Sequence, residues 1–362
     1  AEEQKVFIPE NVNVIRAFAR NTAKHLSIKG KYLSWMAMPD NWQSWIVGGF
    51  FSGLKAIVKD RPSVIVSTYP IASAHIIAYL LHKVTGIPWV ADFRDPMAQA
   101  DYPTDKTKKK IFEWIEKKAV KHCKNVLLTA PGAVTFYHEK FPYIDKSFWQ
   151  LVPNGFDEQI FQGIEAKTKN KTPNQITLLH SGVIYPSERD PSALFQAVAE
   201  LKQEGKLSQD TFKLVLRATG HDVQYQKRLL SLDIIDLIEL APPVPYKAAL
   251  QEMLSVDGLL LLQAGNCDYQ IPAKAYEYIR AKKPVLALTS INGDTGKLLK
   301  SARAACITEL DKKDEIKVTL IEFMEKISSN NFDFLNDEDI QKFSRQYHAI
   351  AFEKILLSAI DN

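Results

Sequence analysis

The chain has 362 residues, of which 46% are hydrophobic and 24% are charged, and its formal net charge at pH 7 is +4. This composition indicates a globular protein of about two domains and excludes collagen, coiled-coil and disordered chains. The small net charge gives no reason to expect nucleic-acid binding. No apolar run reaches about 18 residues, so a transmembrane helix is not expected.

The three cysteines, Cys123, Cys267 and Cys306, are far apart and have no histidine at zinc-ligand spacing. This sparse, odd number fits a reducing compartment, and no signal peptide is visible, so we expect a cytoplasmic protein. The chain begins at Ala1 without Met, and no early strand carries a glycine-rich turn. We therefore expect that N-terminal sequence is missing and that the first domain is incomplete.

The first half of the chain alternates short apolar runs with amphipathic stretches. The predicted helix 71–85 is followed by Gly86 and Pro88, which are typical of a helix end. The expected strands are residues 64–67, 89–93, 125–129 and 148–152, and the expected helices are residues 71–85, 107–122 and 131–141. Alternation of this kind predicts βαβ units and a parallel sheet.

Residues 163–175 are polar and are predicted to be a linker, after which the alternation resumes. The expected strands are residues 176–180, 213–218, 238–240, 258–263 and 285–288; the expected helices are residues 191–204, 223–232 and 245–256, a helix carrying Lys274 and another from Thr295. Asn336 caps a helical region that extends to Ile360. The fold class is therefore α/β, with two doubly wound parallel sheets and a cleft between the domains.

The helix after Gln270 carries Lys274 and Glu277, three positions apart and close to its N-terminus. This spacing places a cation and a carboxylate on one helix face, where backbone N–H groups also favour anions. A cation beside a phosphate and a carboxylate beside a hydroxyl suit a nucleoside diphosphate. The alternative is an exposed ion pair worth about 0.3 kcal/mol.

Three sequence strings carry a resemblance to a known family. Residues 152–157 read VPNGFD and are followed by Phe161; residues 92–96 read DFRDP; and residues 67–75 have the pattern S-x-x-P-x-x-S-x-H. By itself, Pro-Asn-Gly is only a turn signal. Together, the strings resemble a bacterial branch of the family-4 retaining glycosyltransferases.

The resemblance implies the GT-B fold, made of two Rossmann-like domains. It implies an acceptor-side domain at residues 1–165, a nucleotide-sugar domain at 166–335, and a helical segment at 336–362 that could pack back on the first domain. The implied activity is retaining transfer from a nucleotide-diphosphate sugar to a glycan or lipid-linked acceptor, without a metal cofactor. The alternatives are a sugar-nucleotide epimerase, which needs acid/base carboxylates, and a non-catalytic partner subunit.

For donor binding, the resemblance assigns Glu277 to the ribose, as the second glutamate of an E-x7-E motif. The first glutamate falls at Tyr269 and is absent, with Asp268 beside it. Gly182 and Arg189 follow the first strand of the second domain, facing the donor diphosphate. Arg189 and Lys274 are the two catalytic cations expected to stabilise the leaving diphosphate.

For the other candidate residues on the donor and acceptor sides, the sequence leaves two roles open. Arg217, at a strand end, either binds the donor or forms a rim salt bridge, and Thr295 either faces the donor or caps its helix. On the acceptor side, His75 is the candidate catalytic histidine or a buried structural one; Asp92, Arg94 and Asp95 position the acceptor or form a buried ion-pair network. The acidic triplet 337–339 has a D-x-D spacing, but as a helix cap it predicts no metal site.

Lysines crowd the predicted helix 107–122 and its flanks, and large apolar residues are dense in residues 32–45. The two groups are Lys106, Lys108, Lys109, Lys110, Lys117, Lys118, Lys121 and Lys124, with Phe112, Trp114 and Ile115 among them, and Tyr32, Trp35, Met36, Met38, Trp42 and Trp45. A basic, aromatic surface suits an anionic bilayer, although most charge runs are merely solvated. Because the resemblance implies action on lipid-linked sugars at the cytoplasmic face of the inner membrane, we expect peripheral contact there.

Overall fold

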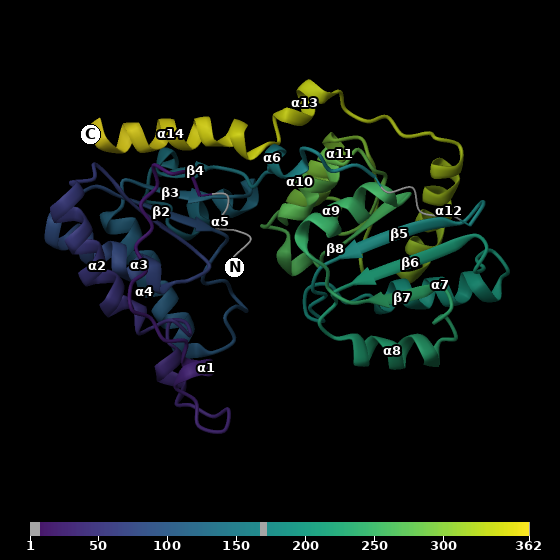
Figure 1. Ribbon diagram of the computed structural model, residues 1–362, viewed down its shortest axis with the longest axis horizontal. Coiled ribbons are helices and arrows are strands. Elements are labelled where there is room, and N and C mark those ends of the chain that lie inside the picture. The colour runs from purple at the N-terminus through teal and green to yellow at the C-terminus, as the bar shows by residue number, and fades with distance from the viewer. Residues whose placement is uncertain (1–7, 167–171, 362) are drawn as a thin grey trace. The chain divides into compact units, whose positions relative to one another are not determined.

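The computed structural model describes residues 8–166 and 172–361. The chain forms two compact units (Figure 1). The first contains the chain up to Leu128, Tyr137–Leu151 and the residues from Glu353 on; the second contains Thr129–Phe136 and Val152–Phe352. The predicted linker falls within the second unit, and its residues 167–171 lie outside the described part of the chain.

The first unit is built on a parallel sheet whose strands follow chain order. They are β1 (Ile65–Thr68), β2 (Trp89–Arg94), β3 (Asn125–Leu128) and β4 (Trp149–Leu151). The helices α3 (Ser73–Thr85), α4 (Lys106–His122) and α5 (Pro131–Lys140) and the short η3 (Lys146–Phe148) connect them. Residues 89–91 and 93 are buried, as expected for a parallel strand covered on both faces.

Local sequence signals determine where the connecting helices begin and end. Helix α3 ends at Gly86, which adopts φ 73° and donates its N–H to the carbonyl of His82. Helix α4 begins after Asp105, whose carboxylate accepts the N–H of Lys108 at 2.8 Å. These ends therefore lie within one residue of the positions expected from the sequence.

Before β1 lie α1 (Thr22–His25), η2 (Ser34–Ala37) and α2 (Trp45–Asp60), none of which was expected from the sequence. Helix α2 packs against α3 at two glycines. A Cβ at Gly49 would lie 2.6 Å from Ile77 Cδ1, and one at Gly53 would lie 2.7 Å from Leu81 Cδ1. Small residues at these positions therefore allow the two helices to approach closely.

The second unit contains a six-stranded parallel sheet with the strand order β10-β9-β8-β5-β6-β7. The strands are β5 (Ile176–Ser181), β6 (Phe212–Arg217), β7 (Ile238–Ala241), β8 (Gly258–Leu262), β9 (Val285–Leu288) and β10 (Ala305–Thr308). The chain winds outward from β5 to β7 and then returns to β8, on the other side of β5. Ligands in such sheets bind at this reversal, outside the carboxyl ends of the strands.

The remaining helices connect these strands and complete the chain (Figure 1), and the last of them, α14, belongs to the first unit from Glu353 on. They are α6 (Glu158–Phe161), α7 (Ser192–Gln203), α8 (Asp222–Ser231), α9 (Tyr246–Ser255), η4 (Gly265–Cys267), α10 (Ala273–Arg280), α11 (Asp294–Ser301), α12 (Lys313–Ser328), α13 (Asp337–Gln341) and α14 (Arg345–Asp361). The predicted class of two parallel-sheet α/β domains is confirmed. The sequence analysis did not anticipate β10 or α12.

The VPNG string lies where the C-terminal segment packs on residues 154–156. Phe156 exchanges backbone hydrogen bonds with Phe343 and Arg345, and the Arg345 side chain donates to Gly155 O at 3.0 Å. A Cβ at Gly155 would lie 2.7 Å from both the Arg345 nitrogen and the Phe343 oxygen. Glycine is therefore required here because another backbone segment occupies the space of a side chain.

A buried charged network holds the loop that follows β2. The Glu116 carboxylate is fully buried and accepts hydrogen bonds from Tyr137 Oη at 2.7 Å, the Ala98 N–H at 3.0 Å and Lys140 Nζ at 2.7 Å. Tyr137 Oη also accepts the N–H of Met97 at 3.0 Å. Burial raises the pKa of the Glu116 carboxyl, and the Lys140 charge opposes that shift.

Replacing Glu116 with Ala removes the acceptor shared by these three donors and breaks its buried ion pair with Lys140, although Lys140 Nζ keeps its hydrogen bond to Ala98 O. We expect the free energy of unfolding to fall by about 3–5 kcal/mol, measured by urea unfolding. The matched control is Glu113→Ala in the same helix, where the side chain is partly exposed and the expected change is within about 0.5 kcal/mol. Equal losses in the two variants would contradict a stabilising role for the network.

Within the described residues, no helix is long and apolar enough to cross a membrane.

Candidate functional site

The side chain of Lys274 reaches the carboxyl end of β5, at the reversal of strand order in the second sheet. Its Nζ lies 2.9 Å from Ser181 O and 3.4 Å from His180 Nε2. Lys274 is the second residue of α10, whose first turn therefore faces the same strand end. The fold therefore places Lys274 at the sheet edge where ligands of such folds bind.

The backbone at Gly182 makes room for this ammonium group. Gly182 has φ +127°, and a Cβ there would lie 3.1 Å from Lys274 Nζ. The Gly182 N–H donates to Arg217 O at 2.9 Å, so the loop stays attached to β6. Glycine thus serves two needs at this position: a backbone conformation that other residues rarely adopt and space for the lysine.

The environment of Lys274 is electropositive and partly shielded from water. Burial and then the nearby Arg189 charge lower the pKa of Lys274 to about 7, while the Glu277 charge opposes the shift. His180 is fully buried and its Nδ1 contacts Leu260 O at 3.0 Å. Burial, followed by the Lys274 charge, holds the pKa of His180 well below its usual range, so this ring stays neutral.

Arg189 is held in the loop between β5 and α7. Its Nη1 donates to Val183 O at 2.8 Å, and its guanidinium lies 5.6 Å from the ring centre of Tyr185. Both contacts leave the fixed positive charge of Arg189 close enough to Lys274 to affect its pKa. The fold thus brings Gly182, Arg189 and Lys274 together, as the sequence analysis expected of a diphosphate site.

Glu277 lies one turn along α10 from Lys274. Its Oε1 accepts a hydrogen bond from Tyr246 Oη at 2.6 Å. Tyr246 is the first residue of α9 and is 48% exposed. The sequence analysis did not single out Tyr246, because α9 and α10 are separated by β8 in the chain and no local pattern connects them.

The other two predicted donor-side residues are engaged within the protein. The Arg217 guanidinium binds both oxygens of Glu252 and donates to Pro242 O at 2.6 Å. This is the salt bridge that the sequence analysis gave as the alternative to donor binding. Thr295 is 1% exposed, and its hydroxyl donates to Gln270 O at 3.0 Å. A donor-binding role for either residue remains a prediction.

The loop after β8 contains a carboxylate beside the position of the absent glutamate. One oxygen of Asp268, Oδ1, is buried and has no hydrogen-bond partner among the described residues. Burial raises the pKa of the Asp268 carboxyl, and a Cβ at Gly293 would lie 2.7 Å from that oxygen. Asp268 therefore points toward the start of α11, where the Asp294 N–H donates to Asp268 O at 3.1 Å.

In the first unit, His75 is fully buried. Its Nδ1 lies 2.7 Å from Ser67 Oγ, which also accepts the indole N–H of Trp89 at 2.8 Å. Burial lowers the pKa of His75 to about 3, so the ring is neutral at physiological pH. This is the geometry of the buried structural histidine that the sequence analysis held as the alternative, and the catalytic role remains a prediction.

The remaining acceptor-side residues lie at the carboxyl end of β2. Asp92 pairs in register with Thr68 of β1, and its Oδ2 accepts the Thr68 hydroxyl at 2.8 Å. Burial raises the pKa of Asp92, while Thr68 and then Arg94 oppose that shift. Arg94 has φ +60°, and the Asp95 N–H donates back to Phe93 O at 2.6 Å. A turn thus directs these polar residues to one edge of the sheet.

The acidic triplet at 337–339 forms ordinary surface ion pairs. Asp337 contacts Lys282 at 2.8 Å and Asp339 contacts Lys342 at 2.7 Å, while Asn336 caps α13. Across the described parts of the chain, His, Cys, Asp and Glu side chains form no group of three or more that could hold a metal ion.

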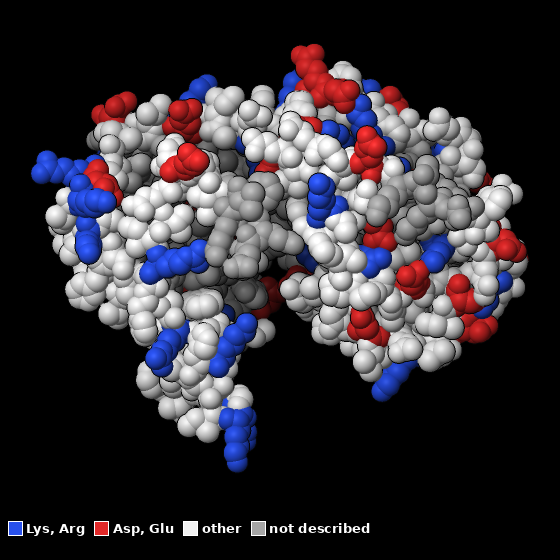
Figure 2. Space-filling view, in the orientation of Figure 1, with Lys and Arg blue, Asp and Glu red and all other residues white. Residues whose placement is uncertain are grey.

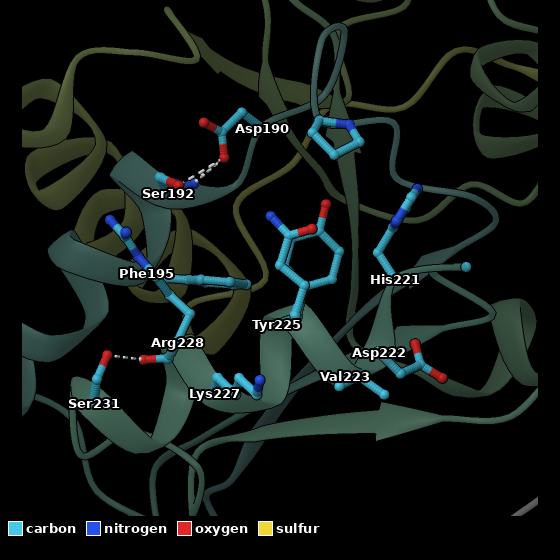
Figure 3. A pocket seen from close by; sticks show the side chains of 13 residues that line it. Asp190, Ser192, Phe195, His221, Asp222, Val223, Tyr225, Lys227, Arg228 and Ser231 are labelled. Carbon is cyan, nitrogen blue, oxygen red and sulfur yellow. Dashed lines mark hydrogen bonds between the residues drawn. The ribbon is translucent and has the colours of Figure 1, made fainter.

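An open pocket of about 1030 Å³ lies elsewhere in the second unit, between α7 and α8 (Figure 3). It is lined by Tyr225, Lys227 and Arg228 of α8 and by Ser192 at the start of α7. The Asp190 carboxylate accepts the Ser192 N–H at 3.0 Å and thereby places a negative charge at the start of α7. The pocket is therefore less suited to an anionic ligand than the end of β5.

No protein-family model and no curated protein sequence matches the chain. Solved structures do resemble it. The structure of Alr3699/HepE from Anabaena in complex with UDP has a TM-score of 0.62 at 15% identity, over 85% of this chain and 82% of that one.

Two further structures show the breadth of the similarity. Sucrose-phosphate synthase from Thermosynechococcus elongatus has a TM-score of 0.63 at 11% identity, covering 87% of this chain and 78% of that one. A putative UDP-N-acetylglucosamine 2-epimerase from Listeria monocytogenes has a TM-score of 0.54 at 12% identity, covering 92% and 82%. With its two parallel-sheet domains, the chain has the GT-B fold, as the sequence strings predicted.

Proposed function

We propose that this protein transfers a sugar from a nucleotide-diphosphate sugar to an acceptor hydroxyl. The observation that carries the proposal is the ammonium group of Lys274 at the carboxyl end of β5, 2.9 Å from Ser181 O, at the reversal of strand order. Within the described residues no carboxylate is in ion-pair contact with it, and Arg189 adds a second positive charge nearby. A site with this charge needs an anionic ligand.

The proposed role of these cations is to hold the donor diphosphate and stabilise the charge that develops on it as the sugar leaves. Fixed positive groups in a partly dry site are effective in this role because they need little reorganisation during the reaction. The first turn of α10 adds its N–H groups and the positive end of its dipole. Lys274 and Arg189 would thus supply the charge that a metal ion supplies elsewhere, and we propose that no metal is required.

We propose that Glu277 accepts hydrogen bonds from the ribose. It follows Lys274 by three residues on the same helix, a separation of about 5–6 Å between Cβ atoms. A nucleoside diphosphate carries its hydroxyls and its phosphates at a comparable separation. Retention at the anomeric carbon is part of the proposal and is supported by the VPNG and DFRDP resemblance.

Asp92, Arg94 and Asp95 are proposed to position the acceptor, which we propose to be a glycan or a lipid-linked sugar. Their location at the carboxyl end of β2 supports this role, because ligands of parallel α/β sheets gather at that edge. The partial burial that raises the pKa of Asp92 also makes it a candidate proton acceptor.

An epimerase is the second candidate, supported by the similarity in fold to the Listeria protein. The two candidates differ in their need for an acceptor. Incubation of UDP-N-acetylglucosamine with the protein alone, followed by chromatography, would show a new sugar nucleotide only if the protein is an epimerase. A non-catalytic partner subunit would give neither this product nor a transfer product.

The first prediction concerns the charge of Lys274. Lys274→Met should weaken the binding of UDP or GDP by about 10-fold to 100-fold, because a charge-assisted hydrogen bond to the diphosphate is lost. Isothermal titration calorimetry measures the change directly.

Lys227→Met is the matched control, because this lysine is exposed and lines the separate pocket between α7 and α8. Its affinity should equal that of the wild type. Weaker binding in Lys227→Met together with unchanged binding in Lys274→Met would place the diphosphate in that pocket instead.

The second prediction concerns the protonation of Lys274. Because its pKa is lowered to about 7, this lysine is mostly neutral at pH 8 in the free protein. A bound diphosphate favours the charged form, so binding at pH 8 should take up a proton, and affinity should fall as pH rises above 7.

Calorimetry with UDP-glucose in two buffers of different ionisation enthalpy measures this uptake, since the diphosphate diester does not itself titrate near pH 8. The uptake should be absent in Lys274→Met. Tight binding by the wild type without proton uptake at pH 8 would show that Lys274 is already charged or does not contact the ligand.

We also propose peripheral contact between the first unit and an anionic membrane. Five exposed residues of α4 recur on one helix face: Lys106, Lys110, Trp114, Lys117 and Lys121. Phe112 and Ile115, grouped with these lysines on sequence, are instead buried in the core. The outer face of α4 is therefore a basic stripe with a tryptophan at its centre, which suits an interface with anionic lipid.

A second exposed feature of the first unit is the segment that leads from α1 into η2. Ile28, Leu33 and Trp35 are 80%, 62% and 64% exposed, and Lys29 and Lys31 lie among them. Figure 2 shows Lys and Arg side chains gathered in this part of the molecule. Met36, Met38, Trp42 and Trp45, which the sequence analysis grouped with Trp35, are at most half exposed.

Replacement of the four α4 stripe lysines with Gln should weaken binding to phosphatidylglycerol-containing vesicles by about 100-fold to 1000-fold, because each lysine near the surface contributes about 1 kcal/mol. Vesicle co-sedimentation at low salt measures the effect. A control with the same net charge replaces four lysines of the second unit with Gln: Lys206, Lys227, Lys247 and Lys300. Equal weakening in both variants would show that only the net charge of the protein matters, and it would contradict a specific role for the α4 stripe.

A further inference from the structure

We propose that Tyr246 is a positioning residue that holds the Glu277 carboxylate for the 2′-hydroxyl of ribose, so that the site prefers ribonucleotides over deoxyribonucleotides. The inference rests on the proposed function and adds to it the determinant of sugar selectivity in the nucleotide. Its basis is the hydrogen bond of 2.6 Å from Tyr246 Oη to Glu277 Oε1.

The fold brings these residues together from two separate helices. Tyr246 opens α9 directly after Pro245, whose extended backbone (φ −53°, ψ 147°) precedes the first helical turn. Glu277 lies in the middle of α10, with the buried Ala275, Tyr276, Tyr278 and Ile279 around it in sequence. The backbone of α10 is thus anchored by its core face, and only the Glu277 side chain needs to be oriented.

A single hydrogen bond leaves the carboxylate free to accept others. An ionised carboxylate has about four acceptor positions, and Tyr246 uses one of them on Oε1. The remaining positions can accept both hydroxyls of a vicinal diol. A carboxylate held before the ligand arrives loses less rotamer freedom on binding, which favours the ligand that uses both hydrogen bonds.

The tyrosine is suited to remain a donor. Partial burial, followed by the Glu277 charge, raises the pKa of Tyr246 above its usual value, so its hydroxyl keeps its proton across the physiological range. Its ring is 48% exposed and so remains accessible next to the carboxylate. Removing the hydroxyl alone therefore tests the positioning role without removing the ring.

The experiment compares four proteins: wild type, Tyr246→Phe, Glu277→Gln and the double variant. Calorimetry gives the affinity of each for UDP and 2′-deoxy-UDP, and for GDP and 2′-deoxy-GDP. Tyr143→Phe serves as the control for the loss of one phenolic hydroxyl, because Tyr143 is 74% exposed and lies in the other unit. Thermal unfolding establishes that every variant is folded.

We expect the wild type to prefer the ribonucleotide, and Tyr246→Phe to lower that preference by about 3-fold to 10-fold. In the Glu277→Gln background, the same change should have no further effect, because Tyr246 acts through the carboxylate. Tyr143→Phe should match the wild type.

An unchanged ribose preference in Tyr246→Phe, with normal diphosphate binding, would overturn this inference and leave the proposed function intact. An equal loss of ribose preference on adding Tyr246→Phe to the wild type and to Glu277→Gln would also overturn it, since Tyr246 would then act without Glu277. Failure of the wild type to bind either diphosphate would overturn the proposed function and this inference together.

Discussion

The candidate site of the second unit centres on one ammonium group at the end of β5, that of Lys274. Lys274 donates to Ser181 O and faces the neutral ring of His180, and within the described residues it has no carboxylate in ion-pair contact. A cation in such a place is costly, which is why its pKa falls to about 7. Groups with strongly shifted pKa values cluster at functional sites, because an incoming ligand supplies the missing partner.

Several features of the surrounding fold serve this one contact. Gly182 leaves space for the ammonium, the strand order places β5 next to β8, and His180 is held by Leu260 of β8. Arg189 is fixed by Val183 within the same loop. These elements place two cations on rigid supports, and a rigid, charged strand end is suited to diphosphate recognition.

The first unit supports its polar residues in a different way. Its buried network of Glu116, Tyr137 and Lys140 holds the backbone at Met97 and Ala98, directly after the DFRDP string. The network therefore stabilises the loop whose first residues are proposed to meet the acceptor. The buried charged residues of this unit thus hold a loop in position, whereas those on the outer face of α4 are exposed to solvent.

The sequence by itself determined the parallel sheets, the helix ends with clear caps and the cationic character of the Lys274 helix. These features follow from local patterns, namely apolar strand runs, Gly86 after α3 and Asp105 before α4. It could not distinguish Arg189, whose charge the fold places near Lys274, from Arg217, which the fold pairs with Glu252, because both lie at or after the end of a strand.

Only the tertiary structure decided that His75 is enclosed, that Phe112 and Ile115 are core residues, and that Tyr246 meets Glu277. It also revealed α2, β10 and α12, whose stability comes largely from the surfaces they pack against. The physical reason is common to all of these cases. Local sequence sets what a segment can form, whereas contacts between distant segments set which side chains are buried, paired or left to bind.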